Sequence, residues 1–185
     1  MSVLDEMLQT NEKFCANPPV DYTNEDHHES KLPKKHLAIV TCMDTRLVNF
    51  LEPALGLTRG DVKIIKQAGN VLTGMFDATV RSLLVCIYEL GVNEIAIIGH
   101  HECGMAKTTS QSLTKAMVER GVSPDAIKMV EKELVEWADS FQRPEENVKQ
   151  VVKQLRENPL IPKDVKVHGL MFHPRSGKVE LLDRE

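Results

Sequence analysis

The chain has 185 residues, of which 42% are hydrophobic and 27% charged, with a net charge of −4. These values are typical of one globular domain and exclude global disorder. No basic stripe indicates nucleic-acid binding, and no apolar run approaches the roughly 20 residues of a membrane-spanning helix. The first residues lack the cationic start of a signal peptide. We therefore expect a cytoplasmic protein that binds neither nucleic acid nor membrane.

The N-terminal residues 1–35 differ in character from the rest of the chain. Residues 1–14 carry a partial apolar stripe that predicts a helix, and residues 16–35 are polar, with three prolines, as in an extended arm. The sequence thus divides into an N-terminal helix with its arm, 1–35, and a single α/β domain, 36–185.

Five short segments of the larger part predict strands because they are apolar and rich in β-branched residues. They are 36–41, 61–66, 94–99, 165–172 and 178–182, the last two forming a hairpin.

Helical spacing of apolar residues separates several of these strands. It runs from Val80 to Leu90, ahead of Gly91, and again from Val148 to Leu155. Ser123 followed by Pro124 predicts a helix start, with an apolar face extending to Trp137. Strands that alternate with helices predict a mostly parallel sheet with helices on both faces.

Three metal-binding residue types follow two of the predicted strands. Cys42 follows the first strand, and His100 and Cys103 follow the third. Two thiolates and one imidazole suit zinc and leave a fourth position for water, and ligands collect at the carboxyl ends of strands in such sheets. On these grounds alone, two buried thiols and a hydrogen-bonded core histidine explain the pattern equally well. Cys15 and Cys86 are better read as ordinary thiols.

Asp44 and Arg46 lie close enough to Cys42 in sequence to converge on a group bound there. A carboxylate paired with a guanidinium stays ionised and is held in place. It could then accept a hydrogen bond from a metal-bound hydroxide. An ordinary surface ion pair is an equally good explanation of this spacing.

Taken together, three motifs resemble the β-class carbonic anhydrases, most closely their short prokaryotic subgroup. The motifs are Cys42-Met-Asp-Thr-Arg46, Ile65-Lys-Gln-Ala-Gly-Asn70 and Gly99-His-His-Glu-Cys-Gly-Met105. The resemblance covers about residues 36–105 and the ending 167–183, and is loose over 106–160. The joint occurrence of the three motifs in this order is highly specific and favours a zinc site over buried structural thiols.

The resemblance implies a sheet of order 2-1-3-4 with an antiparallel edge strand 5. It implies a homodimer, or an oligomer built from dimers, in which the N-terminal helix packs on the partner. It also implies one Zn²⁺ per chain and a set of site residues. These are Cys42, His100 and Cys103 as metal ligands, Asp44 and Arg46 as catalytic dyad, and Ala68, Gly69 and Asn70 along the substrate site.

The activity so implied is that of a carbonate dehydratase, a zinc lyase that reversibly hydrates CO2 to bicarbonate and a proton through zinc-bound hydroxide. Two departures concern the site, since Lys66-Gln67 precedes Ala68 and His101 follows the histidine ligand. Histidines 27, 28 and 101 are candidate proton acceptors, although each is more simply an exposed residue. Two alternatives remain open: a CS2 or carbonyl sulfide hydrolase on the same site, and a catalytically silent zinc-binding protein.

Overall fold

The computed structural model describes residues 2–19, 30–141 and 143–185. The chain forms two compact units, Met1–Lys31 and Leu32–Glu185. The first contains helix α1, Val3–Ala16, which begins at a capping box between Ser2 and Asp5 and contains no buried residue. In the described residues, no helix has both the length and the apolar character needed to cross a membrane.

The second unit is built on a five-stranded sheet of order β2-β1-β3-β4-β5. Its strands are β1 Leu37–Cys42, β2 Val62–Gln67, β3 Glu94–His100, β4 Lys166–Phe172 and β5 Val179–Asp183. The first four run parallel, and β5 pairs antiparallel with β4. The predicted α/β class, the strand order and the C-terminal hairpin are therefore confirmed.

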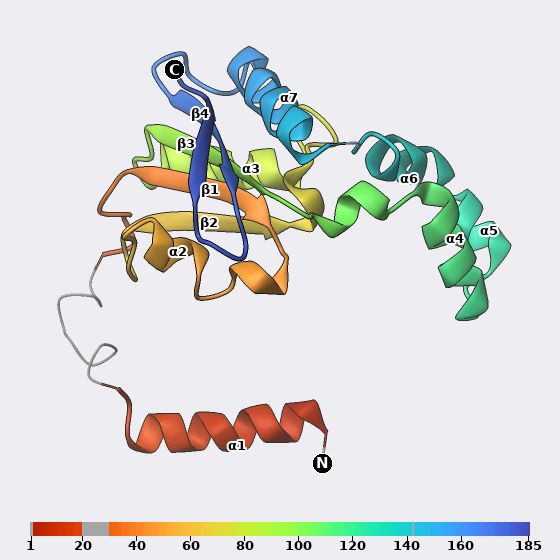
Figure 1. Ribbon diagram of the computed structural model, residues 1–185, viewed down its shortest axis with the longest axis horizontal. Coiled ribbons are helices and arrows are strands. Elements are labelled where there is room, and N and C mark those ends of the chain that lie inside the picture. Colours follow the sequence, from red (N-terminus) through yellow and green to blue (C-terminus); the bar gives the residue numbers. More distant parts are fainter. Residues whose placement is uncertain (1, 20–29, 142) are drawn as a thin grey trace. The chain divides into compact units, whose positions relative to one another are not determined.

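Helices cover both faces of the sheet (Figure 1). On one face lie α3, Ala78–Tyr88, and α7, Pro144–Glu157, whose apolar residues form the main hydrophobic core with the strands. The other face carries the single-turn helix α2, Leu51–Ala54, where Leu51 joins a smaller cluster with Ile39 and Phe172. Both longer helices fall where the apolar spacing predicts them.

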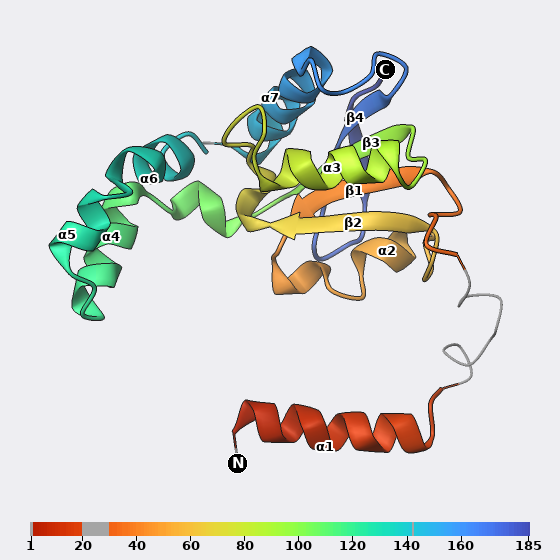
Figure 2. The ribbon, with the colours of Figure 1, turned by 180° about the vertical axis from the view of Figure 1, so that it is seen from behind.

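Three short helices, α4 Ser110–Glu119, α5 Pro124–Lys128 and α6 Glu131–Ala138, form a lobe at one end of the sheet (Figure 2). Ser123 caps α5 as predicted, accepting a hydrogen bond from the amide of Ala126. The expected continuous helix to Trp137 is interrupted, because Val130 leaves helical geometry at φ −119° and caps α6 instead. Helix α4 was not predicted, and it has no buried residue to give an apolar signal.

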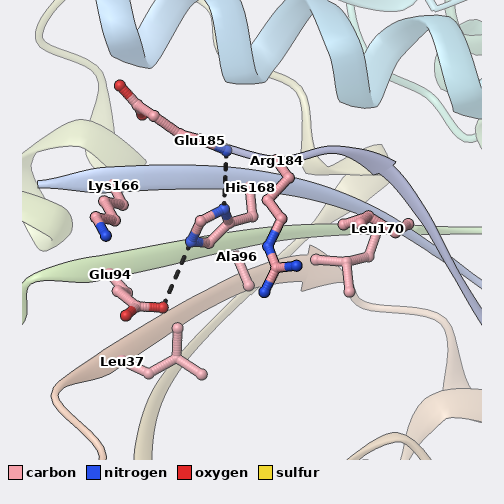
Figure 3. Close-up of a pocket in the computed structure, with 9 residues that line it drawn as sticks. Leu37, Glu94, Ala96, Lys166, His168, Leu170, Arg184 and Glu185 are labelled. Atoms are coloured by element: carbon pink, nitrogen blue, oxygen red, sulfur yellow. Dashed lines mark hydrogen bonds and ion pairs between the residues drawn. The ribbon is translucent and has the colours of Figure 1, made fainter.

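At the amino ends of β1, β3 and β4 the sheet face that carries α2 is hollowed (Figure 3). The hollow has a volume of about 470 Å³, and Leu37, Ala96 and Leu170 contribute apolar surface to it. His168 projects into it between Glu94 and Glu185 (Figure 3). Its Nε2 lies 3.4 Å from the Glu94 carboxylate, and its Nδ1 accepts a hydrogen bond from the Glu185 amide at 3.3 Å.

Candidate metal centre

The carboxyl ends of β1 and β3, which are neighbours, bring together the three predicted ligands. Cys42 is the last residue of β1, His100 is the last residue of β3, and Cys103 follows three residues later. Their ligand atoms all lie within 4.8 Å of one another, and all three residues are buried. The two Sγ atoms are 3.9 Å apart. In the described part of the chain this is the one group of three or more His, Cys, Asp or Glu residues that could hold a metal ion.

This donor set fits zinc. Tetrahedral zinc with Zn–S bonds of about 2.3 Å separates two sulfur ligands by about 3.8 Å, close to the observed separation. His100 Nδ1 lies 3.0 Å from the backbone oxygen of His101, which fixes the ring with Nε2 toward the cysteines. That Nε2 is buried and has no hydrogen-bond partner among the described residues. A buried polar atom left unpaired calls for a ligand, and a metal ion supplies one.

The protonation of the cluster also suits a cation. The hydrogen bond from Cys103 lowers the pKa of Cys42 to about 4, with a further contribution from His100. The same contact, with burial, raises the pKa of Cys103. Burial alone would lower the pKa of His100, but the nearby negative charge of Cys42 leaves it raised. A divalent cation can replace these protons and bind the thiolates and imidazole directly.

Asp44 and Arg46 form a close pair beside the cluster. Arg46 donates from Nε to Asp44 Oδ1 at 3.0 Å and from Nη2 to Oδ2 at 2.8 Å, and its backbone amide also donates to Oδ1. The short 3-10 turn Thr45–Leu47, capped by Asp44, makes this geometry possible. The guanidinium lowers the pKa of Asp44 to about 2. Asp44 Oδ2 lies 3.8 Å from His100 Nε2, so the pair faces the cluster and is more than a surface contact.

The loop Ala68–Asn70 borders the cluster of Cys42, His100 and Cys103 on the side away from the Asp44–Arg46 pair. Gly69 has φ +67°, and a Cβ there would lie 2.9 Å from Met105 Cγ, so no larger residue fits without movement. Asn147 of α7 donates to the Gly69 carbonyl at 3.0 Å. Asn70 is buried, and its Nδ2 has no partner among the described residues.

Gln67, which departs from the motif, secures this same loop. Its Nε2 donates to the Val71 carbonyl at 2.7 Å, and its Oε1 accepts from the Thr79 hydroxyl. Cys42, Cys103, Val71, Met105 and Phe141 pack together as an apolar cluster. The candidate metal ligands therefore lie in a mostly apolar setting.

Three contributing residues were not predicted. Glu102 and Arg175 extend the Asp44–Arg46 pair, and Asn147 supports the loop. Glu102 lies inside the H-x-x-C motif, but Arg175 and Asn147 are distant in sequence, and nothing local to them indicates a role. His101 Nδ1 is 3.5 Å from Glu145, and its ring lies beside that of His173. Residues 27 and 28 lie outside the described residues. Cys86 is buried in α3, and Cys15 is exposed on α1.

Several known proteins are similar to this chain in fold and in sequence. The sequence model described as carbonic anhydrase matches residues 37–179. The crystal structure of β-carbonic anhydrase isoform I from Trichomonas vaginalis has 45% sequence identity and a TM-score of 0.92, covering 100% of this chain and 99% of that one. The Bacillus subtilis protein YtiB, whose description as a carbonic anhydrase is provisional, is 41% identical over 98% of this chain and 97% of its own.

A protein with a different printed activity is also related. A carbon disulfide hydrolase from Acidithiobacillus thiooxidans is 30% identical over 77% of this chain and 75% of its own. The family match, however, spans most of the chain, including all three candidate ligands and both residues of the Asp44–Arg46 pair. The chain belongs to the β-class carbonic anhydrase family.

Proposed function

We propose that this protein catalyses the reversible hydration of CO2 to bicarbonate and a proton, with one zinc ion held by Cys42, His100 and Cys103. The observation that carries the proposal is the buried, unpartnered Nε2 of His100, which faces two cysteine sulfurs beside an ionised Asp44. A zinc ion held by these residues would lower the pKa of a bound water molecule and so supply a nucleophile near neutral pH.

The chain itself would orient the reaction. Asp44 stays ionised because Arg46 binds both of its oxygens, so it can only accept a hydrogen bond from the nucleophile. Arg46 thereby fixes the direction from which the nucleophile attacks. The surrounding apolar side chains suit an uncharged, nonpolar substrate such as CO2. The unpaired amide of Asn70 is a donor available to a substrate oxygen.

Stopped-flow CO2 hydration on protein of measured zinc content tests this proposal. We expect fast hydration at one zinc per chain, loss of activity on chelation, and recovery when zinc is restored. Cys42→Ser should lose both zinc and activity. A zinc-loaded protein without hydration would contradict the proposed reaction, and a carefully prepared protein that binds no zinc would contradict the metal site.

Carbon disulfide or carbonyl sulfide hydrolysis is a second candidate, supported by the related carbon disulfide hydrolase. The same nucleophile could attack either carbon centre, and release of H2S distinguishes them. Sulfide release faster than CO2 hydration would favour this reaction. A zinc-loaded protein inactive on all three substrates would instead indicate a silent zinc-binding role.

The N-terminal part, 1–35, is proposed to mediate dimerisation of the 36–185 catalytic domain. Helix α1 has a face of exposed apolar side chains, namely Val3, Leu4, Met7, Leu8 and Phe14. Such a face on a helix with no buried residue suits contact with a second copy. Light scattering should give a dimer, or a multiple of one, for the full chain. Leu4→Ser combined with Leu8→Ser should shift it toward monomer, whereas an unchanged mass would contradict this role for α1.

A further inference from the structure

Arg46 has partners beyond Asp44. Its Nη2 also donates to the backbone oxygen of Glu102 at 2.9 Å, and its Nη1 donates to Glu102 Oε2 at 3.2 Å. Glu102 lies between His100 and Cys103, and its φ is +57°, a left-handed conformation that few residues other than glycine adopt. Such a conformation persists only where its surroundings hold it. The contacts with Arg46 help to do so.

A second arginine binds the other side of Glu102. Arg175 Nη2 lies 3.1 Å from both carboxylate oxygens of Glu102. Arg175 comes from the turn between β4 and β5, which is closed by hydrogen bonds between His173 and both Gly177 and Lys178. A row of side chains of alternating charge therefore leads from the candidate metal site to the β4–β5 turn, formed by Asp44, Arg46, Glu102 and Arg175.

The exposure of these ion pairs favours a role in positioning side chains over a role in stabilising the fold. The side chains of Arg46, Glu102 and Arg175 are 38%, 52% and 73% exposed, and exposed ion pairs contribute little to stability. Arg46, however, has a rigid planar fork. Glu102 binds Nη1 and Nη2 of this guanidinium, while Nε and Nη2 bind Asp44. By fixing the plane of the guanidinium, Glu102 also restricts the orientation of the Asp44 carboxylate.

We propose that Glu102 and Arg175 are positioning residues for the Asp44–Arg46 pair, with Arg175 fixing Glu102 and Glu102 fixing the plane of the Arg46 guanidinium. The role of these residues in catalysis rests on the proposed hydration of CO2. Neither is a catalytic residue, because each acts through Arg46. Loss of Arg175 should therefore leave zinc binding intact and lower the rate only modestly.

Arg175→Ala tests this inference, with Arg143→Ala as matched control. Arg143 is 75% exposed and pairs with Glu146 at 3.6 Å, an ion pair that includes neither Arg46 nor Glu102. We expect Arg175→Ala to lower kcat/KM for CO2 about three- to five-fold, with unchanged zinc content and Tm. Arg175→Lys should recover at least half of the loss, and Arg143→Ala should match wild type. In an Arg46→Ala background Arg175→Ala should have no further effect, because both act through the same group.

NMR of the Arg46 side chain gives a readout independent of activity. In zinc-loaded protein, Arg175→Ala should speed rotation of the Arg46 guanidinium relative to wild type and to Arg143→Ala. Equal rotation rates, or rate losses that add in the double variant, would overturn the inference. If wild-type protein does not hydrate CO2, the proposed function fails, and the NMR comparison still decides whether Arg175 positions Arg46.

Discussion

Two histidines at opposite ends of neighbouring strands have opposite surroundings. His168, near the amino end of β4, has both ring nitrogens matched by the protein, one by Glu94 and one by the Glu185 amide (Figure 3). His100, at the carboxyl end of β3, has one nitrogen fixed by its neighbour's carbonyl and the other buried without a partner. Both lie among charged groups and both border apolar side chains. The unsatisfied nitrogen favours the carboxyl end as the site of the proposed metal and reaction.

Replacing each histidine by alanine should give the largest contrast. His100→Ala removes one of the three proposed ligands, so we expect zinc affinity to fall by more than about 100-fold, with a corresponding loss of activity. His168→Ala should retain zinc and activity and lose no more than about 1 kcal/mol of stability, since its partners are half-exposed. Metal analysis after dialysis and chemical denaturation measure the two quantities. Equal zinc retention in the two variants would remove the basis of the comparison.

The carboxylates beside the two histidines should differ in the same way. Asp44→Asn keeps the shape but places an amide where Arg46 needs an acceptor, so we expect kcat/KM to fall by about 100-fold or more with zinc retained. Glu94→Gln changes the partner of His168 at the other end of the strands, where an exposed pair has little effect. Stopped-flow assays at matched zinc content compare them. A near-normal rate for Asp44→Asn would leave the Asp44–Arg46 pair without a catalytic role.

The cost of adding a side chain should also differ between the carboxyl and amino ends of the strands. At Gly69 an alanine would have both a left-handed φ and a Cβ only 2.9 Å from Met105, so Gly69→Ala should cost about 2–4 kcal/mol. At Gly60, φ is +90° but nothing lies within 4 Å of an added Cβ. Gly60→Ala should therefore cost only the backbone strain of about 1–2 kcal/mol. Denaturation of both variants gives the difference, and equal losses would show that Met105 moves aside freely.

The sequence predicts the candidate metal ligands better than it predicts the residues that hold the site in place. Apolar runs locate all five strands, and the resemblance in motif identifies Cys42, His100 and Cys103, which the structure brings together. These residues are recognisable because metal chemistry restricts the donor types and strand ends restrict their positions. Arg175 could not be found this way, because its contact with Glu102 spans 73 residues and depends on how the β4–β5 turn is placed.

The helices also differ in how well the sequence predicts them. Helices α3 and α7 bury one face each, and their apolar spacing predicts them. Helix α4 has no fully buried residue; a capping box between Thr109 and Ser112 begins it, and the Ser110 amide and hydroxyl donate to the Asp139 carboxylate. Its apolar residues are not gathered on a buried face, so the spacing that predicts α3 and α7 does not predict it.

The smallest expected effect is a change of stability with pH at the amino end. Asp61, just before β2, accepts hydrogen bonds from the Thr58 amide at 2.9 Å and from the Thr58 hydroxyl, and the amide bond is the main reason its pKa is lowered. Because the folded-state pKa lies below the unfolded value, this contribution is complete above about pH 4 and is lost as pH falls through the folded pKa.

Asp61→Asn should therefore lower the Tm by about 2 °C at pH 7, with the difference shrinking below pH 4. Its zinc content and CO2 hydration should equal those of wild type, because the side chain lies at the end of the sheet away from the cluster. Thermal unfolding from pH 3 to 7 measures the first effect and stopped-flow assays the second. A loss of activity at unchanged Tm would mean that the amino ends of the strands also influence the reaction, and that the division between a stabilising end and a reactive end is wrong.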